Sequence, residues 1–205
     1  MDWPVILSIA SGVVLIACFK AAYLLRNHKG WSADKQEIVG NLIGVVLAFA
    51  MLVFVESLLQ HFLGTSFYCL WATGSTLPFT VFLAGAVLGI VYEYYGQYAF
   101  TCWEYPAIER RRWMMLLTPV FWGMFMLIMQ DVWALLQQAG VNDVWSVIIT
   151  SLSVFGVLEG FNLLTHSWIY KGRANTPYAL VAGWIILTLT FVVGYNHFFT
   201  SPFGF

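Results

Sequence analysis

Charged residues are scarce in this sequence: Asp, Glu, Lys and Arg make up 9% of its 205 residues. Soluble domains carry about 25% charged residues, whereas hydrophobic residues here reach 60% and the mean hydropathy is +0.79. We therefore expect an all-α, polytopic membrane protein that forms one domain over residues 1–205, with the lipid bilayer as its surroundings. The basic residues form no patch outside the loops that flank the membrane, which excludes nucleic-acid binding.

Cysteine is also rare, and its spacing carries no signature. Cys18, Cys69 and Cys102 have neither CxxC nor metal-ligand spacing, so they predict packing residues rather than a disulfide or a metal site. The first residues, Met-Asp-Trp-Pro, lack the basic region that begins a cleaved signal peptide. We therefore expect the first hydrophobic stretch to be retained as a membrane span.

Common catalytic motifs are absent as well. The sequence has no Walker loop, no GxSxG, no HExxH, no DxxxD pair of the kind that binds diphosphate through magnesium, and no Pro-x-Glu motif of small membrane lycopene cyclases. No lysine lies in the middle of the last hydrophobic stretch, which argues against a retinal protein. No cofactor is indicated.

The chain does contain six hydrophobic stretches long enough to cross a bilayer, which takes about 20 residues each. We expect these spans at residues 4–25, 38–63, 79–101, 113–137, 144–169 and 177–198. The uncharged, aromatic segment between the second and third spans, residues 64–78, is too polar to cross the membrane. It is expected to lie at the level of the lipid headgroups.

The basic residues predict an orientation. Of nine Lys and Arg residues, eight lie in the loops after the first, third and fifth spans, and Lys20 lies near the same side. The positive-inside rule places these loops in the cytoplasm. We therefore predict a multi-pass protein of the cell membrane with both termini exoplasmic.

A carboxylate, Glu93, interrupts the third span. Gly85, Gly89, Glu93 and Gln97 recur every four residues, so they share one helix face, and the glycines let a neighbouring helix approach closely. An ionised Glu in hydrocarbon costs about 2.5–3.5 kcal/mol on insertion scales, so Glu93 is expected to face a partner, a cavity or a ligand. The aromatic end of this span, at Trp103, is expected to anchor it at the membrane surface.

Residues 156–170 look like a looser copy of this segment. Both copies contain a glutamate, then an amide, then a tryptophan: Glu93, Gln97 and Trp103 in the first, and Glu159, Asn162 and Trp168 in the second. The preceding spans also resemble each other, which predicts a weak parallel repeat of helices two–three and four–five, over residues 38–98 and 113–170. Chance similarity between aromatic-rich helices is the alternative.

Four acids lie at two depths in the predicted spans. Counting along the helices places Glu93 and Glu159 at matching depth in the cytoplasmic half. Glu56 and Asp131 lie near the outer helix ends, where we expect them to reach water. His61 and His197, also near outer ends, could pair as haem or metal ligands, although no further His or Cys completes a set, so no metal site is assigned. No residue is therefore predicted to bind a metal.

Glu93 and Glu159 are the candidate catalytic residues. Small residues beside both acids favour a close contact of the third and fifth helices, which would bring the two carboxyls into one pocket. The structural alternative is that each carboxyl is neutral and hydrogen-bonded to a tyrosine or an amide. The side chains expected to bind the substrate are Gln97, Asn162, Tyr94, Tyr98, Trp103, Trp168 and His166.

Three functions fit this pattern. The preferred one is a site that binds or modifies a lipophilic molecule, an isoprenoid or a lipid, because a carboxylic acid beside electron-rich rings suits alkene protonation and carbocation stabilisation. The second is a proton- or cation-coupled transporter that uses the same acids. The third is a non-catalytic subunit that packs on other membrane subunits. Whether the protein is an enzyme is left open.

Overall fold

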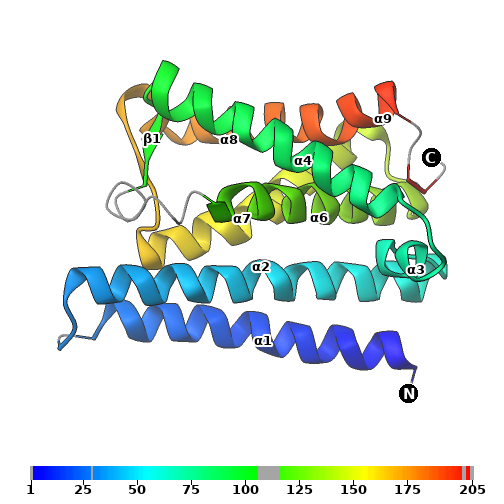
Figure 1. Cartoon of the computed structure of the whole chain (residues 1–205), viewed down its shortest axis with the longest axis horizontal. Coiled ribbons are helices and arrows are strands. Elements are labelled where there is room, and N and C mark those ends of the chain that lie inside the picture. The colour runs from blue at the N-terminus through cyan, green and yellow to red at the C-terminus, as the bar shows by residue number, and fades with distance from the viewer. Residues whose placement is uncertain (1, 29, 106–115, 200–201, 204–205) are drawn as a thin grey trace.

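The computed structural model describes residues 2–28, 30–105, 116–199 and 202–203. Six helices in this part of the chain are long and apolar enough to cross a membrane, as expected for an all-α polytopic membrane protein (Figure 1). The helical elements are α1 (Trp3–Arg26), α2 (Ala33–Leu63), α3 (Phe67–Ala72), α4 (Leu77–Glu93), its π-helical continuation η1 (Tyr94–Ala99), α6 (Thr118–Gln138), α7 (Asp143–Thr165), the 3₁₀ turn η3 (Gly172–Asn175), α8 (Pro177–Thr188), the π-helical η4 (Leu189–Gly194) and α9 (Tyr195–Phe198).

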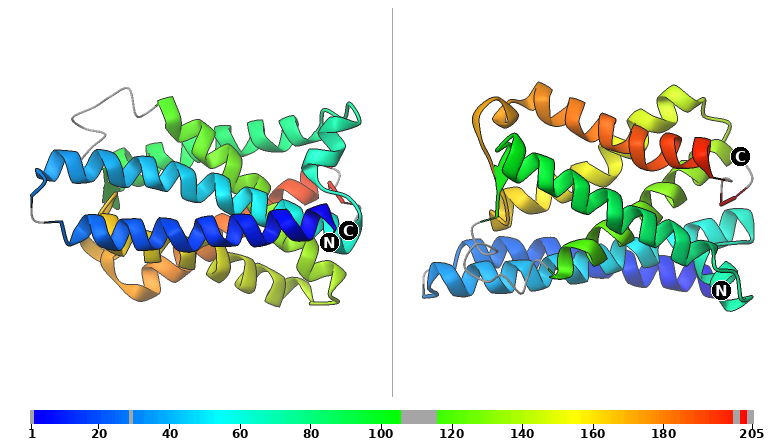
Figure 2. Two further views of the ribbon diagram at one scale, coloured as in Figure 1. Left: turned by 90° about the horizontal axis from the view of Figure 1, so that it is seen from below. Right: turned by 45° about the horizontal axis from the view of Figure 1, so that its top comes forward.

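The helices form three layers. In Figure 1, α1 and α2 lie along one side, α6 and α7 occupy the middle, and α4 and α8 cover the opposite side. The right view of Figure 2 shows the same order, and the left view, from below, has α1 and α2 in front. The middle helix α6 contacts both α2 and α4, and it is the most buried of the six spans, at 56%. Both termini lie at one end of the bundle, and the loops after α1, η1 and α7 lie at the other. The predicted sidedness of these two ends stays a prediction.

The expected spans agree with the observed helices to within a few residues, with one clear exception. The fifth was expected to continue to residue 169, but α7 ends at Thr165 because His166 adopts a left-handed conformation with φ 51°. The Asn162 side chain then accepts a hydrogen bond from the backbone N–H of Trp168, 3.0 Å away, which holds the chain as it turns back. The start expected for the fourth span, residues 113–115, lies outside the described residues.

The segment between α2 and α4 contains a short helix rather than only a loop. Gly64 ends α2 in a left-handed conformation with φ 71°, and α3 begins after Ser66, whose hydroxyl accepts from the N–H of Cys69. Phe67 is buried against the bundle. The expectation that residues 64–78 lie at the level of the lipid headgroups stays a prediction.

Two short strands join loops that are far apart in the sequence. Strand β1 (Trp103–Glu104) pairs antiparallel with β2 (Ile169–Tyr170), so that Trp103 lies opposite Tyr170. The backbone N–H of Lys171 also donates to the carbonyl of Cys102, and the Lys171 ammonium pairs with the Glu104 carboxylate. This sheet holds the loop after η1 against the loop after α7.

The glycine face of the third span packs closely, as predicted, but on a different helix. A β-carbon at Gly89 would lie 2.1 Å from Cγ of Trp122, and one at Gly85 would lie 2.3 Å from Cβ of Met126, both in α6. Only glycine allows this approach. Next to Glu159, in contrast, a β-carbon at Gly156 would meet nothing within 4 Å. The expected packing of the third helix on the fifth is therefore wrong: α4 packs on α6.

Candidate functional site

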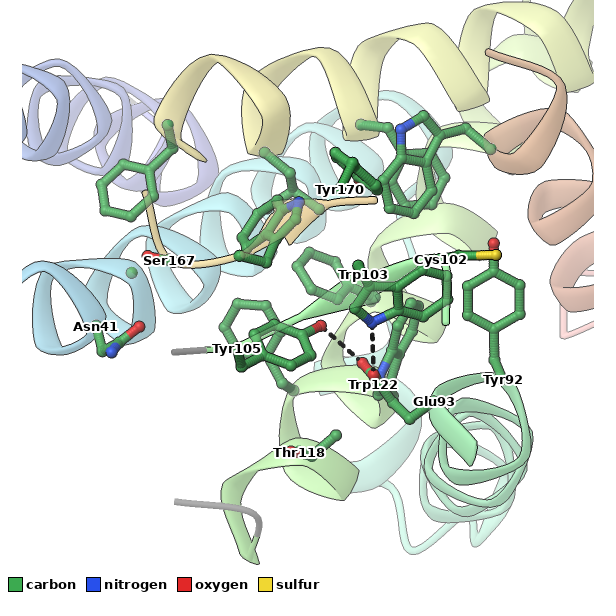
Figure 3. Close-up of a pocket in the computed structure, with 18 of the residues that line it drawn as sticks. Asn41, Tyr92, Glu93, Cys102, Trp103, Tyr105, Thr118, Trp122, Ser167 and Tyr170 are labelled. Atoms are coloured by element: carbon green, nitrogen blue, oxygen red, sulfur yellow. Dashed lines mark hydrogen bonds between the residues drawn. The ribbon is translucent and has the colours of Figure 1, made fainter. Parts of the chain in front are cut away.

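A cavity of about 460 Å³ lies at the end of the bundle that carries the basic loops (Figure 3). Its walls come from α2, α4, α6, α7, η3, α8 and both strands, and they are mainly apolar and aromatic. The aromatic lining residues are Tyr92, Trp103, Tyr105, Phe121, Trp122, Phe125, Phe155, Phe161, Trp168, Tyr170 and Trp184.

Glu93 is the acidic residue in this wall. Its side chain is only 6% exposed, and its two oxygens accept four hydrogen bonds, three of them from cavity-lining rings (Figure 3). The donors are Trp122 Nε1 at 2.9 Å and the Tyr105 hydroxyl at 2.8 Å on Oε1, and Trp103 Nε1 at 3.0 Å and Gln97 Nε2 at 2.7 Å on Oε2.

The four partners place hydrogen-bond donors on both carboxyl oxygens. The two indole N–H groups can only donate, so Trp103 and Trp122 each require an acceptor oxygen on Glu93. The Tyr105 phenol also stays a donor, because burial and the neighbouring Glu93 raise its pKa well above 10.0. The site therefore holds one buried carboxyl group whose two oxygens are oriented by neutral donors.

The local backbone brings these donors together. After Glu93 the chain passes through the π-helical turn η1 and reverses at Thr101, which has φ 49°. The reversal returns Trp103 onto Gly96, where a β-carbon would lie 1.8 Å from Cη2 of the indole. The indole of Trp103 folds back to donate to Glu93, and a buried carboxyl group requires such donors. The expected role of Trp103 as an anchor at the membrane surface stays a prediction.

Tyr92 lies between two of these tryptophans. Its ring stacks on Trp103 with centroids 5.3 Å apart, and meets Trp122 edge-on at 5.6 Å. Aromatic pairs in such geometries contribute about 0.5–1.5 kcal/mol beyond their buried area. The rings around Glu93 are thus fixed by hydrogen bonds on one edge and by stacking on their faces.

Glu159 lies in a different environment. It is half-buried, accepts a 2.5 Å hydrogen bond from the Tyr170 hydroxyl, and lines a second cavity of about 230 Å³ beside Trp184. The indole N–H groups of Trp168 and Trp184 lie near it but have no hydrogen-bond partner among the described residues. Burial and the Glu159 carboxyl raise the pKa of Tyr170, so this phenol also remains a donor.

The single pocket expected for Glu93 and Glu159 is therefore not formed. Each acid lines its own cavity, and the two cavities share Phe155, Leu180 and Trp184 as a common wall. The reason is the packing of α4 on α6, since α6 supplies Trp122 where α7 was expected to bring Glu159.

The other predicted binding residues fall into three groups. Trp103 and Trp168 line the main cavity, whereas Gln97 and Asn162 lie behind it as hydrogen-bond partners of Glu93 and of the Trp168 backbone. The last three residues lie away from both cavities: Tyr94 and Tyr98 are 59% and 61% exposed on η1, and His166 is exposed at the end of α7.

Sequence reasoning missed the contributions of the helices that follow each acid. Trp122 reaches Glu93 from α6, and Trp184 separates the two cavities from α8. Each is a tryptophan inside a predicted span, and only the apparent repeat could have directed attention to both. Tyr105 follows Trp103 by two residues at the aromatic end of the third span, and its hydroxyl donates to Glu93.

No metal site is evident in the part of the chain that the structure describes, where no three His, Cys, Asp or Glu residues gather. His61 and His197 each meet the following phenylalanine edge-to-face, and the three cysteines are free. Comparison with protein-family models, with curated proteins and with solved structures finds no match. The function therefore has to be argued from the geometry of the site.

Proposed function

We propose that this membrane protein binds a lipophilic small molecule, an isoprenoid or a lipid, in the cavity beside Glu93. The observation that carries the proposal is an aromatic cavity of about 460 Å³ with one buried, fully hydrogen-bonded carboxylate in its wall. Small-molecule sites are typically clefts of about 300–1,000 Å³ with mostly apolar walls and a few fixed polar groups.

The outer rim of the cavity supports a ligand that arrives from the bilayer. Leu42, Val45 and Leu117 line the cavity and are also 58%, 40% and 42% exposed on the outside of the bundle. Apolar side chains on this rim favour a hydrocarbon chain. Arg173 and Asn41 also line the cavity and supply polar contacts near the basic loops, so the ligand we propose is an amphiphile with its polar end there.

The carboxyl group of Glu93 defines the chemistry of the site. A carboxylate that already accepts four hydrogen bonds is poorly suited to donate a proton to an alkene, which revises the role expected from the sequence. It suits the stabilisation of positive charge, to which the faces of Tyr92 and Trp103 add. That charge would belong either to a ligand headgroup or to a cationic intermediate if the protein is an enzyme.

The predicted orientation and repeat fit this proposal. With the basic loops in the cytoplasm, the cavity lies in the cytoplasmic half of the membrane. Two observations support a repeat: β1 pairs with β2, and each acid has a tryptophan from the following helix nearby, Trp122 for Glu93 and Trp184 for Glu159. Both remain proposals, as does the single domain over residues 1–205.

Filling the cavity tests the proposal. Gly183 lines it, and a β-carbon there would lie 3.7 Å from the Tyr92 hydroxyl, so Gly183→Leu places a larger side chain inside. Ala182→Leu is the matched control, because the neighbouring Ala182 is exposed on the same helix and lines neither cavity.

The readout is the lipid that copurifies with each protein, identified and counted by native mass spectrometry. We expect one lipophilic molecule per wild-type chain and per Ala182→Leu chain. Overpacking costs about 1–3 kcal/mol, so occupancy in Gly183→Leu should fall roughly tenfold or more. Equal occupancy in the two variants, or an empty wild-type protein, would overturn the proposal.

A further inference from the structure

The other end of the bundle contains a second buried acid that the cavity does not involve. Asp131 lies in α6 and is 0% exposed, and neither of its carboxyl oxygens has a hydrogen-bond partner among the described residues. This differs from the expectation that it reaches water near the helix end. A buried, unpaired carboxylate is very costly, so such a group gains a proton or a counter-charge.

The neighbour of Asp131 is another carboxyl group. Glu56 of α2 lies beside it, and one Glu56 oxygen, Oε2, accepts the backbone N–H of Tyr68 at 3.1 Å. Without a proton both groups can only accept hydrogen bonds, so they repel. One proton converts the same contact into a hydrogen bond between a carboxylic acid and a carboxylate, which is how paired acids share a site.

We propose that Glu56 and Asp131 together bind one exchangeable proton, forming a protonation site at the end of the bundle opposite the cavity. The site is independent of the proposed lipid-binding function. Asp131 is closed off, whereas Glu56 is only partly buried, so exchange with the surroundings would pass through Glu56.

The other titratable groups on elements packed against α6 have their own partners or lie elsewhere. On α4, Glu93 binds Trp122, which precedes Asp131 by nine residues, or about 14 Å along the helix. On α7, Asp143 accepts from Gln137 and Glu159 accepts from Tyr170. On α2, His61 is exposed and meets the ring of Phe62 edge-to-face.

One further titratable group belongs to the helix that runs beside Asp131. Gln130 donates to the carbonyl of Phe191, so η4 passes at this level of α6. Tyr195 follows one turn later, and its hydroxyl is buried without a partner in the described part of the chain. Tyr195 contributes a phenol and not a carboxyl group, so Glu56 and Asp131 are the two acids of this site.

A proton fits the site better than a metal cation. Calcium takes 6–8 oxygen ligands, and magnesium requires near-octahedral coordination. At this site one oxygen of Glu56 accepts the backbone N–H of Tyr68, which is a donor and cannot bind a cation. The described residues also contain no cluster of three or more metal-ligating acids, histidines or cysteines.

Infrared spectroscopy of the purified protein tests the proposal directly. At neutral pH we expect a carboxylic-acid C=O band equivalent to one group, which Asp131→Asn and Glu56→Gln each abolish, because the new amide donates to the remaining carboxylate. Asp143→Asn is the control, since Asp143 is exposed and bound to Gln137, and this variant should keep the band.

Stability gives a second readout. A proton held in the folded state and released on unfolding makes the unfolding equilibrium constant rise about tenfold per pH unit while the proton stays bound. Asp131→Asn should remove this pH dependence of the unfolding equilibrium constant. If Asp131→Asn does not fold, Glu56→Gln provides the same test. A wild-type protein without the band, a band that survives both substitutions, or a stability that changes when choline replaces sodium at fixed pH would each overturn the proposal.

Discussion

The indole ring of Trp103 lies directly on Gly96, so closely that a β-carbon at residue 96 would be 1.8 Å from its Cη2 atom. The same indole donates its N–H to Glu93. The absence of a side chain at Gly96 therefore decides whether the loop after η1 can fold back and complete the wall of the cavity.

Gly96→Ala is expected to displace Trp103 and destabilise the protein. Overpacking of this kind costs about 1–3 kcal/mol, and loss of the Glu93 hydrogen bond adds to it. Gly156→Ala is the control, because a β-carbon there meets nothing within 4 Å. Unfolding in detergent mixtures measures the difference; equal stability of the two variants would contradict the packing described.

Glu93→Gln should be more damaging than its small change in shape implies. The new amide group faces hydrogen-bond donors, and each buried donor left unpaired costs on the order of 1–3 kcal/mol. The tryptophan emission should also change, since Trp103 and Trp122 both bind this carboxylate.

Glu104→Gln is the matched control for this substitution. Glu104 pairs with Lys171 at a site where both side chains are partly exposed, and exposed ion pairs contribute about 0–1 kcal/mol. If the two variants had equal stability and equal emission spectra, the four-donor arrangement around Glu93 would not hold in the folded protein.

Stability should fall at alkaline pH because of two buried phenols. Burial first, and then Glu93 and Glu159, raise the pKa of Tyr105 and Tyr170 above 10.0. In the unfolded chain these phenols lose their protons near pH 10, so above about pH 10 the folded state binds more protons and stability decreases as pH rises.

Replacement of either phenol should flatten this decrease. Tyr105→Phe and Tyr170→Phe should each lower the stability at neutral pH, because each removes a hydrogen bond to an acid. Above pH 10, the stability of either variant should decrease less with pH than that of the wild type. Tyr178→Phe, at an 88% exposed position, should follow the wild-type curve. Parallel curves for all four proteins would show that these phenols ionise equally in both states.

The orientation can be read from cysteine labelling in a background without the three native cysteines. Cysteines placed at Asn27, Gln36 and Asn175, at the end of the bundle that carries the basic residues, should be protected from an impermeant thiol reagent in intact cells. One placed at Thr76, at the other end of the bundle, should react. The reverse pattern would invert the topology.

The sequence was sufficient for the spans because length and hydropathy alone decide whether a helix suits a membrane. The glycine face of α4 was also readable, since spacing by four residues fixes which side chains share a face. The helix that packs on that face was not readable: Trp122 and Met126 fill the space above Gly85 and Gly89, and this depends on tertiary packing.

The candidate site was predictable only in part for a related reason. Glu93 was identified because a carboxylate in an apolar stretch needs partners. Its partners come from a two-residue strand and from α6, and neither leaves a periodic signal in the sequence. Depth counting predicted that Asp131 lies near the outer end of its span, but could not show that the surrounding helices bury it completely.

The pairing of β1 with β2 also imposes an order of assembly. Trp103 and Tyr105 are synthesised before α6 and α7, but the strand that holds them in place, Ile169–Tyr170, leaves the ribosome only after α7. Proteins begin to fold from the N-terminus during synthesis. Trp103 and Tyr105 are therefore present before β2 exists to hold them, and Glu93 lacks these two hydrogen bonds until β2 is made. A chain that stops before Ile169 would contain every hydrogen-bond donor of Glu93 and still leave the cavity wall open.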